Sequence, residues 1–145
     1  NGAITLGTLD GANVEILEAV GEENIVIFGL KTEEVNQLVA EGYKPWEWYN
    51  RSERVKQTLD FIRTMTVGGM NFNFLVDYLL NDDPFMCLAD FESYIYAQQQ
   101  IEEAYNDEKQ WQKMSLVNTA KAGIFSADRA VKEYADRIWH ITQVR

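Results

Sequence analysis

Cysteine and histidine are almost absent from this sequence of 145 residues, which contains one of each. The single cysteine, Cys87, excludes an internal disulfide and a cysteine-based metal cluster. Its apolar neighbours in FMCLAD predict a buried structural thiol, and so little cysteine fits a reducing, cytoplasmic environment. A serine-hydrolase triad would depend on His140, but this histidine follows Trp139 at the end of a predicted helix, where a capping role is favoured.

Positive charge and long apolar runs are also scarce. The 13 Lys and Arg residues face 23 Asp and Glu residues, which gives a net charge of −10. Because this charge repels phosphate backbones and anionic surfaces, neither a nucleic acid nor a membrane is expected as a partner. No apolar run approaches the roughly 20 residues of a transmembrane helix. The first residues lack a basic leader, so we expect no signal peptide, and a first residue of Asn suggests a chain boundary rather than an initiator.

The first 30 residues combine two strand patterns with a helix between them. Apolar and small polar residues alternate over 3–8, and the turn sequence LDGAN follows. A short helix with an apolar side over residues 14–20 then ends at Gly21. The apolar run NIVIFG predicts a second strand, buried on both faces as in a parallel sheet. Strand, helix and strand within about 28 residues are typical of a βαβ unit.

From residue 32 onward the pattern is helical, with no convincing strand. Capping residues and apolar stripes predict about six helices. In chain order, each helix begins at or contains one of the residues Thr32, Ser52, Phe74, Asp90, Trp111 and Ser126. We expect Thr32, Ser52, Asp90 and Ser126 to be the caps. KPWEWYN is expected to form a turn and TVGGMNFN a loop.

The predicted fold class is therefore α/β, with two parallel strands followed by helices. We interpret residues 1–145 as a single partial domain, with the βαβ unit in 1–30 and the helical portion in 31–145. Two parallel strands cannot make a stable sheet alone, because a parallel sheet needs more strands and cover on both faces. The unit is thus expected to be the end of a doubly wound sheet whose other strands lie upstream.

The first candidate site is the stretch GTLDGANVE, a turn followed by a helix start. It is neither a GxGxxG fingerprint nor a Walker A loop, and Asp10, Asn13 and Glu15 do not follow the EF-hand spacing. One interpretation is that the turn lines a site. The other is that Asp10 and Asn13 cap a helix while Gly11 supplies a permissive φ.

The other candidates are weaker. The aromatic residues Trp46, Trp48 and Tyr49 could stack on a sugar, but packing in a core is favoured. The acidic pairs Asp82-Asp83 and Glu102-Glu103 are interpreted as solvated faces. No residue is singled out as catalytic or as a metal ligand.

Long stretches of the chain resemble the α-glucan (glycogen, starch and maltodextrin) phosphorylases. NGAITLGTLDGANVEILEAVGEENIVIFG is similar to the segment that follows the pyridoxal-phosphate lysine of that family. AGIFSADRAVKEYADRIWHI is similar to the family's closing helix, and ADFESYIYAQQQIEEAYNDEKQWQKMSLVNTA to the two helices before it. The resemblance implies the C-terminal part of a Rossmann-like domain of the GT-B type.

The resemblance also implies an activity for a longer parent protein. That family releases glucose 1-phosphate from α-1,4-glucans by phosphorolysis with pyridoxal phosphate, and the parent is expected to be a homodimer. The family's lysine motif and phosphate-binding residues lie upstream of this chain. The chain alone is therefore expected to bind no cofactor and to be inactive, with Asp10, Gly11 and Asn13 supporting the cofactor region by packing and hydrogen bonds.

A different class of function remains open beside this one. The chain could be an acidic, helical protein-interaction module with no enzymatic activity, which would bury its open sheet edge and apolar helix faces against a partner.

Overall fold

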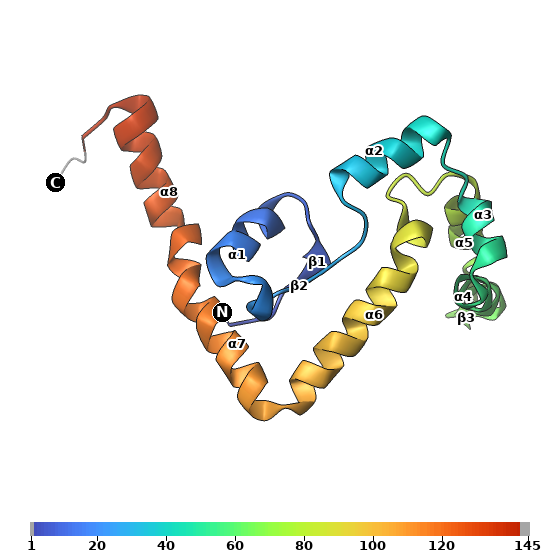
Figure 1. Cartoon of the computed structure of the whole chain (residues 1–145). Helices are drawn as coiled ribbons and strands as arrows, with labels where there is room; N and C mark the ends of the chain where they lie inside the picture. Colours follow the sequence, from blue (N-terminus) through green and yellow to red (C-terminus); the bar gives the residue numbers. More distant parts are fainter. Residues whose placement is uncertain (1, 143–145) are drawn as a thin grey trace.

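The computed structural model describes residues 2–142 and begins with the predicted βαβ unit. Strand β1 (Leu6–Thr8) leads through helix α1 (Ala12–Val20) and the 3₁₀ turn η1 (Glu22–Asn24) to strand β2 (Val26–Phe28). The two strands are parallel, with Leu6 opposite Val26 and Thr8 opposite Phe28. Figure 1 shows this unit (blue) between the arms of two long helices. The prediction of two parallel strands is confirmed.

The strands are shorter and less buried than the sequence predicts. The ladder spans three residues of each strand, and all of them are only half-buried. The reason is that each strand has a single neighbour among the described residues, whereas burial on both faces requires a wider, covered sheet. Full burial is reached just before β2, at Asn24 and Ile25.

Seven α-helices follow β2 in the described part of the chain. They are α2 (Thr32–Glu41), α3 (Pro45–Arg51), α4 (Glu53–Thr64), α5 (Asn73–Asn81), α6 (Cys87–Asn106), α7 (Glu108–Lys121) and α8 (Ala127–Tyr134). A 3₁₀ turn, η2 (Ala122–Phe125), joins α7 to α8, and a π-helical turn, η3 (Ala135–Trp139), continues α8. His140 lies at the C-cap of that turn, as predicted.

Helix α3 corrects the expected turn at KPWEWYN. Pro45 lies at the first helical position, where its missing N–H costs nothing and its φ is already helical. The proline therefore starts a short helix instead of a turn. Trp46 is also not a core residue, because 52% of it is exposed, whereas Trp48 and Tyr49 pack against the core as predicted.

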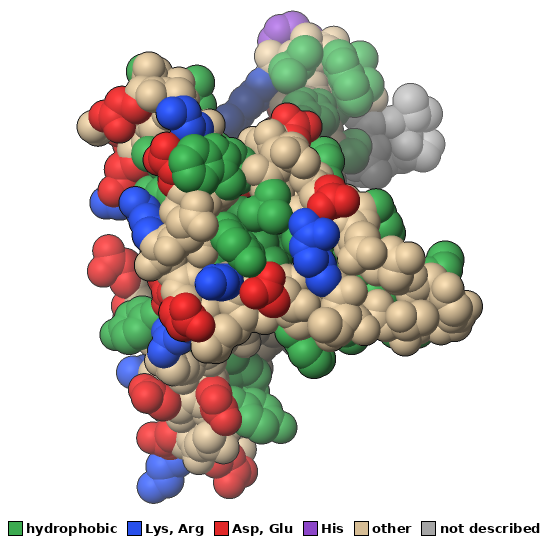
Figure 2. All heavy atoms as spheres, turned by 90° about the vertical axis from the view of Figure 1, so that its right-hand side faces the viewer, with side chains coloured by type: hydrophobic (Ala, Val, Ile, Leu, Met, Phe, Trp, Pro, Cys, Tyr) green, Lys and Arg blue, Asp and Glu red, His purple; other side chains and the backbone are tan. Residues whose placement is uncertain are grey.

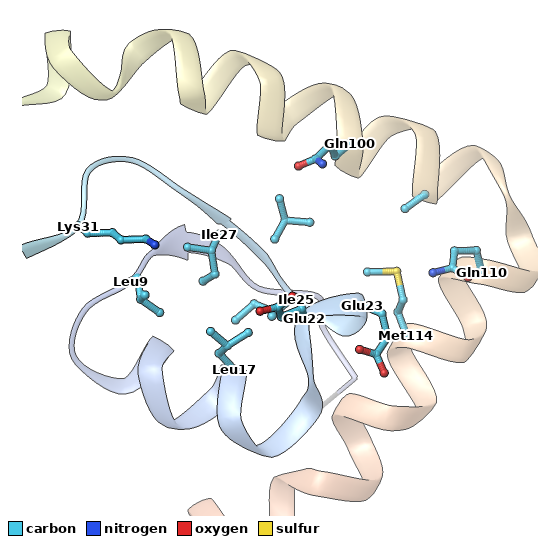
Figure 3. Close-up of a pocket in the computed structure, with 12 residues that line it drawn as sticks. Leu9, Leu17, Glu22, Glu23, Ile25, Ile27, Lys31, Gln100, Gln110 and Met114 are labelled. Carbon is cyan, nitrogen blue, oxygen red and sulfur yellow. The ribbon is translucent and has the colours of Figure 1, made fainter. Parts of the chain in front are cut away.

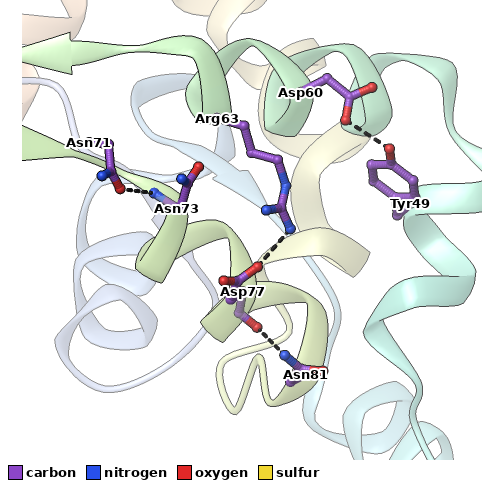
Figure 4. Close-up of polar contacts among 7 residues, drawn as sticks. All are labelled: Tyr49, Asp60, Arg63, Asn71, Asn73, Asp77 and Asn81. Atoms are coloured by element: carbon purple, nitrogen blue, oxygen red, sulfur yellow. Dashed lines mark hydrogen bonds and ion pairs between the residues drawn. The ribbon is translucent and has the colours of Figure 1, made fainter.

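A small hairpin corrects the expected loop at TVGGMNFN. Strands β3 (Thr66–Val67) and β4 (Met70–Asn71) pair antiparallel, with Val67 opposite Met70. Gly68 and Gly69 form the connection, both with positive φ, as a two-residue hairpin of matching twist requires. After β4, the Asn71 side chain accepts a hydrogen bond from the Asn73 amide (Figure 4).

The main core lies where α3, α4, α5 and α6 meet. Its fully buried members are Val55, Leu59, Val76 and Leu88. Exposed polar contacts close its rim, including Tyr49 to Asp60 and Arg63 to Asp77 (Figure 4). Ser52 caps α4 as predicted, since its hydroxyl accepts a hydrogen bond from the Val55 amide.

The start of α6 differs from the prediction, because Asp90 does not cap it. The helix begins at Cys87, and the carboxylate of Asp83 accepts hydrogen bonds from the amides of Cys87 and Leu88 at 2.8 and 2.9 Å. Asp83 is 1% exposed and also accepts a bond from the Tyr43 hydroxyl. Burial, and then this bond, raise the pKa of Tyr43 well above its usual value, so the hydroxyl stays a donor.

The described part of the chain is open in shape. Helices α6 and α7 form a V around the βαβ unit, and α8 extends from the end of α7 away from the rest (Figure 1). The predicted cap at Ser126 has the right position, but its side chain makes no capping hydrogen bond. The apolar stripe that runs along α8 and η3 is exposed at Val131, Tyr134 and Ile138. Figure 2 shows further hydrophobic side chains open to solvent on the opposite side of the molecule, where α3 to α5 lie.

Candidate functional site

The turn after β1 is held by side chains that point back to the strand. The Thr8 carbonyl accepts hydrogen bonds from the Asp10 amide at 2.9 Å and from Asn13 Nδ2 at 2.8 Å. The Thr8 hydroxyl donates to Asp10 Oδ1 at 3.0 Å. Gly11 has a φ of 47°, which favours glycine. The sequence prediction of a permissive φ at Gly11 is confirmed.

The predicted capping by Asp10 and Asn13 is wrong. The N-cap position of α1 is Gly11, and no side chain caps the helix there. The Asn13 side chain turns back over β1, where a Cβ atom added at Gly7 would lie 2.5 Å from Asn13 Nδ2. Glycine at position 7 thus leaves the room in which Asn13 ties the helix to the end of the strand.

Side chains of α6 accept hydrogen bonds from the backbone at the carboxyl end of β2. The Gly29 amide donates to Ser93 Oγ at 2.9 Å, and the Leu30 amide donates to Asp90 Oδ1 at 2.8 Å. Gly29 has a φ of 84°, and a Cβ there would lie 2.7 Å from Asp90 Oδ2. Partial burial raises the pKa of Asp90, and the bond from Leu30 opposes that shift. The sequence pattern predicts only a capping role for Asp90, because contacts some 60 residues apart leave no local pattern.

A cavity of about 430 Å³ lies at these strand ends. It is lined by Thr8, Asp10, Phe28, Phe85, Cys87, Asp90, Phe91 and Tyr94. The rings of Phe28 and Tyr94 meet edge to face, with centroids 5.2 Å apart. Aromatic side chains beside two hydroxyls and two carboxylates are suited to contacts with apolar faces and hydrogen-bond donors.

Cys87 lies exposed at this cavity, which corrects the predicted buried thiol. It occupies the first turn of α6, where the apolar run FMCLAD places Leu88 and not Cys87 in the core. Partial desolvation and the charge of Asp83 raise the pKa of its thiol. The sulfur therefore stays protonated and is a poor nucleophile.

A second cleft of about 540 Å³ lies between the βαβ unit and the V of α6 and α7. Figure 3 shows Leu17, Ile25 and Ile27 on one side of it, with Gln100 and Gln110 on the long helices. Its charged lining residues are Glu22, Glu23 and Lys31. This cleft runs along β2 from Ile25 and reaches Leu9 and Lys31, which follow the carboxyl ends of β1 and β2.

Neither cavity has the side chains that pyridoxal phosphate needs. The residues that line the strand-end cavity include two carboxylates and no Lys or Arg, so they oppose a phosphate group. Lys31 is the one basic residue among those that line the larger cleft, and two glutamates share that lining. The linings of these two cavities therefore do not fit pyridoxal phosphate. Within residues 2–142, no group of three or more His, Cys, Asp or Glu side chains is placed to hold a metal ion.

Comparison with known proteins decides the family. The sequence matches the family model described as "Phosphorylase: Carbohydrate phosphorylase" over residues 1–141. The chain belongs to the carbohydrate phosphorylase family. As a member of this family, it is similar to the glycogen phosphorylase of Synechocystis, with 47% identity over 99% of this chain. It is also 43% identical to that of Haemophilus influenzae, over 100% of the chain, and 42% identical to the brain form of Ovis aries, over 96%.

This carbohydrate phosphorylase chain spans only 17–18% of the length of those relatives. The motif around Asp10, Gly11 and Asn13 therefore belongs to one part of a phosphorylase. None of the helices described is both long and apolar enough to cross a bilayer.

Proposed function

We propose that this chain is the C-terminal part of an α-glucan phosphorylase whose full-length form releases glucose 1-phosphate from α-1,4-glucans. The observation that carries this proposal is the match to glycogen phosphorylases over nearly the whole chain, at 39–47% identity. The parent is then a cytoplasmic, homodimeric glycosyltransferase. Its other strands complete the sheet, of which β1 and β2 form the end, within a Rossmann-like domain of the GT-B type. Residues 1–145 are one part of that domain.

The surface area supports the proposal that the rest of the parent chain is the main partner. A compact monomer of 16.7 kDa is expected to expose about 7,600 Å². This chain exposes 10592 Å², and its exposed large hydrophobic residues include Phe74, Phe85 and Ile138. The excess is the area that a larger phosphorylase would cover.

The chemistry of the parent lies outside these residues in this proposal. Pyridoxal phosphate, when bound, supplies a phosphate that handles protons beside the substrate phosphate, and it is held by residues that precede this chain. No residue here is proposed to be catalytic. The isolated chain binds no cofactor and is inactive, since a cofactor enzyme needs the group bound and oriented.

Asp10, Gly11 and Asn13 have a supporting role in the proposal. Ligands of open α/β sheets bind outside the carboxyl ends of the strands, which is where this turn lies. The Asn13 bond to the Thr8 carbonyl holds α1 against the end of β1. These residues set the position of the strand end without touching the reacting atoms.

The test is release of glucose 1-phosphate from maltooligosaccharide and phosphate, with pyridoxal phosphate added. The 145-residue chain is compared with the protein at its full natural length. Activity of the longer protein alone supports the proposal. Activity of the short chain contradicts its inactivity, and activity of neither contradicts the parent function and favours the interaction module.

A further inference from the structure

Helix α6 makes three contacts with the end of β2, and all come from one stretch of the helix. Asp90 and Ser93 accept hydrogen bonds from two successive amides, those of Leu30 and Gly29. One helical turn after Asp90, Tyr94 packs edge to face on Phe28. Because residues three and four apart share a helix face, one face of α6 holds the whole strand end.

These contacts also set the distance between the strand ends and the helix. A Cβ atom added at Gly29 would lie 2.7 Å from Asp90 Oδ2 and 3.1 Å from the methyl group of Thr8. The backbone at Gly29 therefore lies in close contact with both α6 and β1. Asp90 and Thr8 both line the strand-end cavity. The width of that cavity therefore depends on the bond between the Leu30 amide and Asp90.

We propose that Asp90 is a positioning residue for phosphorolysis, which acts by fixing the carboxyl end of β2 and hence the neighbouring Thr8–Asn13 turn. The inference rests on the proposed function, because it places the strand ends at the floor of the active cleft of the parent enzyme. Ser93 assists by holding the preceding amide.

The test uses the full-length protein and the variants Asp90→Ala, Asp90→Asn and Ser93→Ala. Asp90→Ala frees the Leu30 amide and shifts the turn, so kcat falls on the order of tenfold to a hundredfold with little change in KM. Asp90→Asn keeps an oxygen acceptor of the same shape and restores most of the kcat. Ser93→Ala is expected to lower kcat by a smaller factor, again with little change in KM. It replaces Asp90→Ala in the test if that variant does not fold.

Glu92→Ala is the matched control. Glu92 lies on the same turn of α6 and also accepts two long-range hydrogen bonds, from the Ser52 hydroxyl and from Arg54, but these lead to α4. It is expected to leave kcat unchanged. Hydrogen exchange of the Gly29 and Leu30 amides gives a second measurement, which should accelerate in Asp90→Ala and not in Glu92→Ala.

The outcomes separate the two proposals. Equal kcat values for Asp90→Ala and Glu92→Ala, or faster exchange with no loss of kcat, overturn the positioning role. An unmodified full-length protein that releases no glucose 1-phosphate overturns the proposed function instead, whatever the amide exchange shows.

Discussion

Asn13 and Gly7 illustrate how one residue depends on another in this chain. The side-chain amide of Asn13 turns back over the strand and donates a hydrogen bond to the Thr8 carbonyl. It can do so because position 7 has no side chain. Alanine at position 7 would normally stabilise the chain slightly by restricting its unfolded state. Here the added methyl group would clash with Asn13, so we expect alanine at position 7 to destabilise the chain.

We predict that Gly7→Ala and Asn13→Ala are not additive. Asn13→Ala should cost about 1 kcal/mol through the lost hydrogen bond. Gly7→Ala should cost about 1–3 kcal/mol alone, because the methyl group displaces Asn13, and close to nothing once Asn13 is alanine. Native-state hydrogen exchange of the α1 amides gives the local free energies.

Gly123→Ala is the control for that cycle, since a Cβ there meets no atom within 4 Å. It should leave the exchange of α1 unchanged. Strictly additive effects of the substitutions at positions 7 and 13 would contradict the contact.

Cys87 and Asp90 show which residue-scale predictions fail. Both stand in the run FMCLAD, from which the sequence predicts a buried thiol and a cap. Which side of the helix faces the core depends on where α6 starts, and the start is set by Asp83 and not by Asp90. The N-cap is Met86, four residues before the predicted cap, so the apolar run lies in the first turn of the helix and only some of its side chains face the core.

At the scale of elements, the start of α6 depends on a buried carboxylate that joins three segments. Asp83 lies between α5 and α6, and Tyr43 reaches it from the loop between α2 and α3 at 2.7 Å. Removing a donor from a buried charge leaves that charge less well compensated. The Tyr43 hydroxyl therefore ties the loop between α2 and α3 to the start of α6.

We predict that Tyr43→Phe loosens the start of α6, whereas Tyr49→Phe does not. Both hydroxyls donate to a carboxylate at 2.7 Å, but Asp83 is buried and the Tyr49 bond to Asp60 is exposed. Tyr43→Phe should cost about 1.5–3 kcal/mol. The exchange rates of the Cys87 and Leu88 amides measure the effect.

Tyr49→Phe matches the change in chemistry and should leave those two amides as protected as before, because exposed polar pairs contribute little. Equal protection in the two variants would show that burial of Asp83 does not strengthen its bond to Tyr43.

Element-scale predictions succeed where a local pattern is complete. The helix after Ser52 and the parallel pair β1 and β2 follow directly from capping and periodicity. The sequence alone misses α3 and the β3–β4 hairpin because both are short. A helix of seven residues and strands of two residues are too brief for a period to be recognised.

At the scale of the whole molecule, the open shape is the main finding. The V of α6 and α7 encloses only two strands, and α8 extends with its apolar side exposed (Figure 1). The described sheet has no third strand beside β1 or β2. Bare strand edges and apolar helix faces favour association with other chains.

We predict that the isolated 145-residue chain self-associates or melts without a sharp transition. Size-exclusion chromatography with light scattering and differential scanning calorimetry measure this directly. The protein at its full natural length is the control and should melt cooperatively as a defined oligomer. A monodisperse 16.7 kDa monomer with one sharp transition would contradict the view that the sheet is incomplete.

The sequence by itself determined the class of fold, the order of its main elements and the resemblance to phosphorylases. These depend on local patterns and on motif order, both of which are read along the chain. Only the tertiary structure decided how Tyr43 meets Asp83, how Asp90 holds the end of β2, and that Cys87 is exposed. The physical reason is that these features depend on contacts between residues 40 to 60 positions apart, or on the start of a helix that such a contact holds. The donors in these contacts are backbone amides or single hydroxyls, which leave no signature in the sequence.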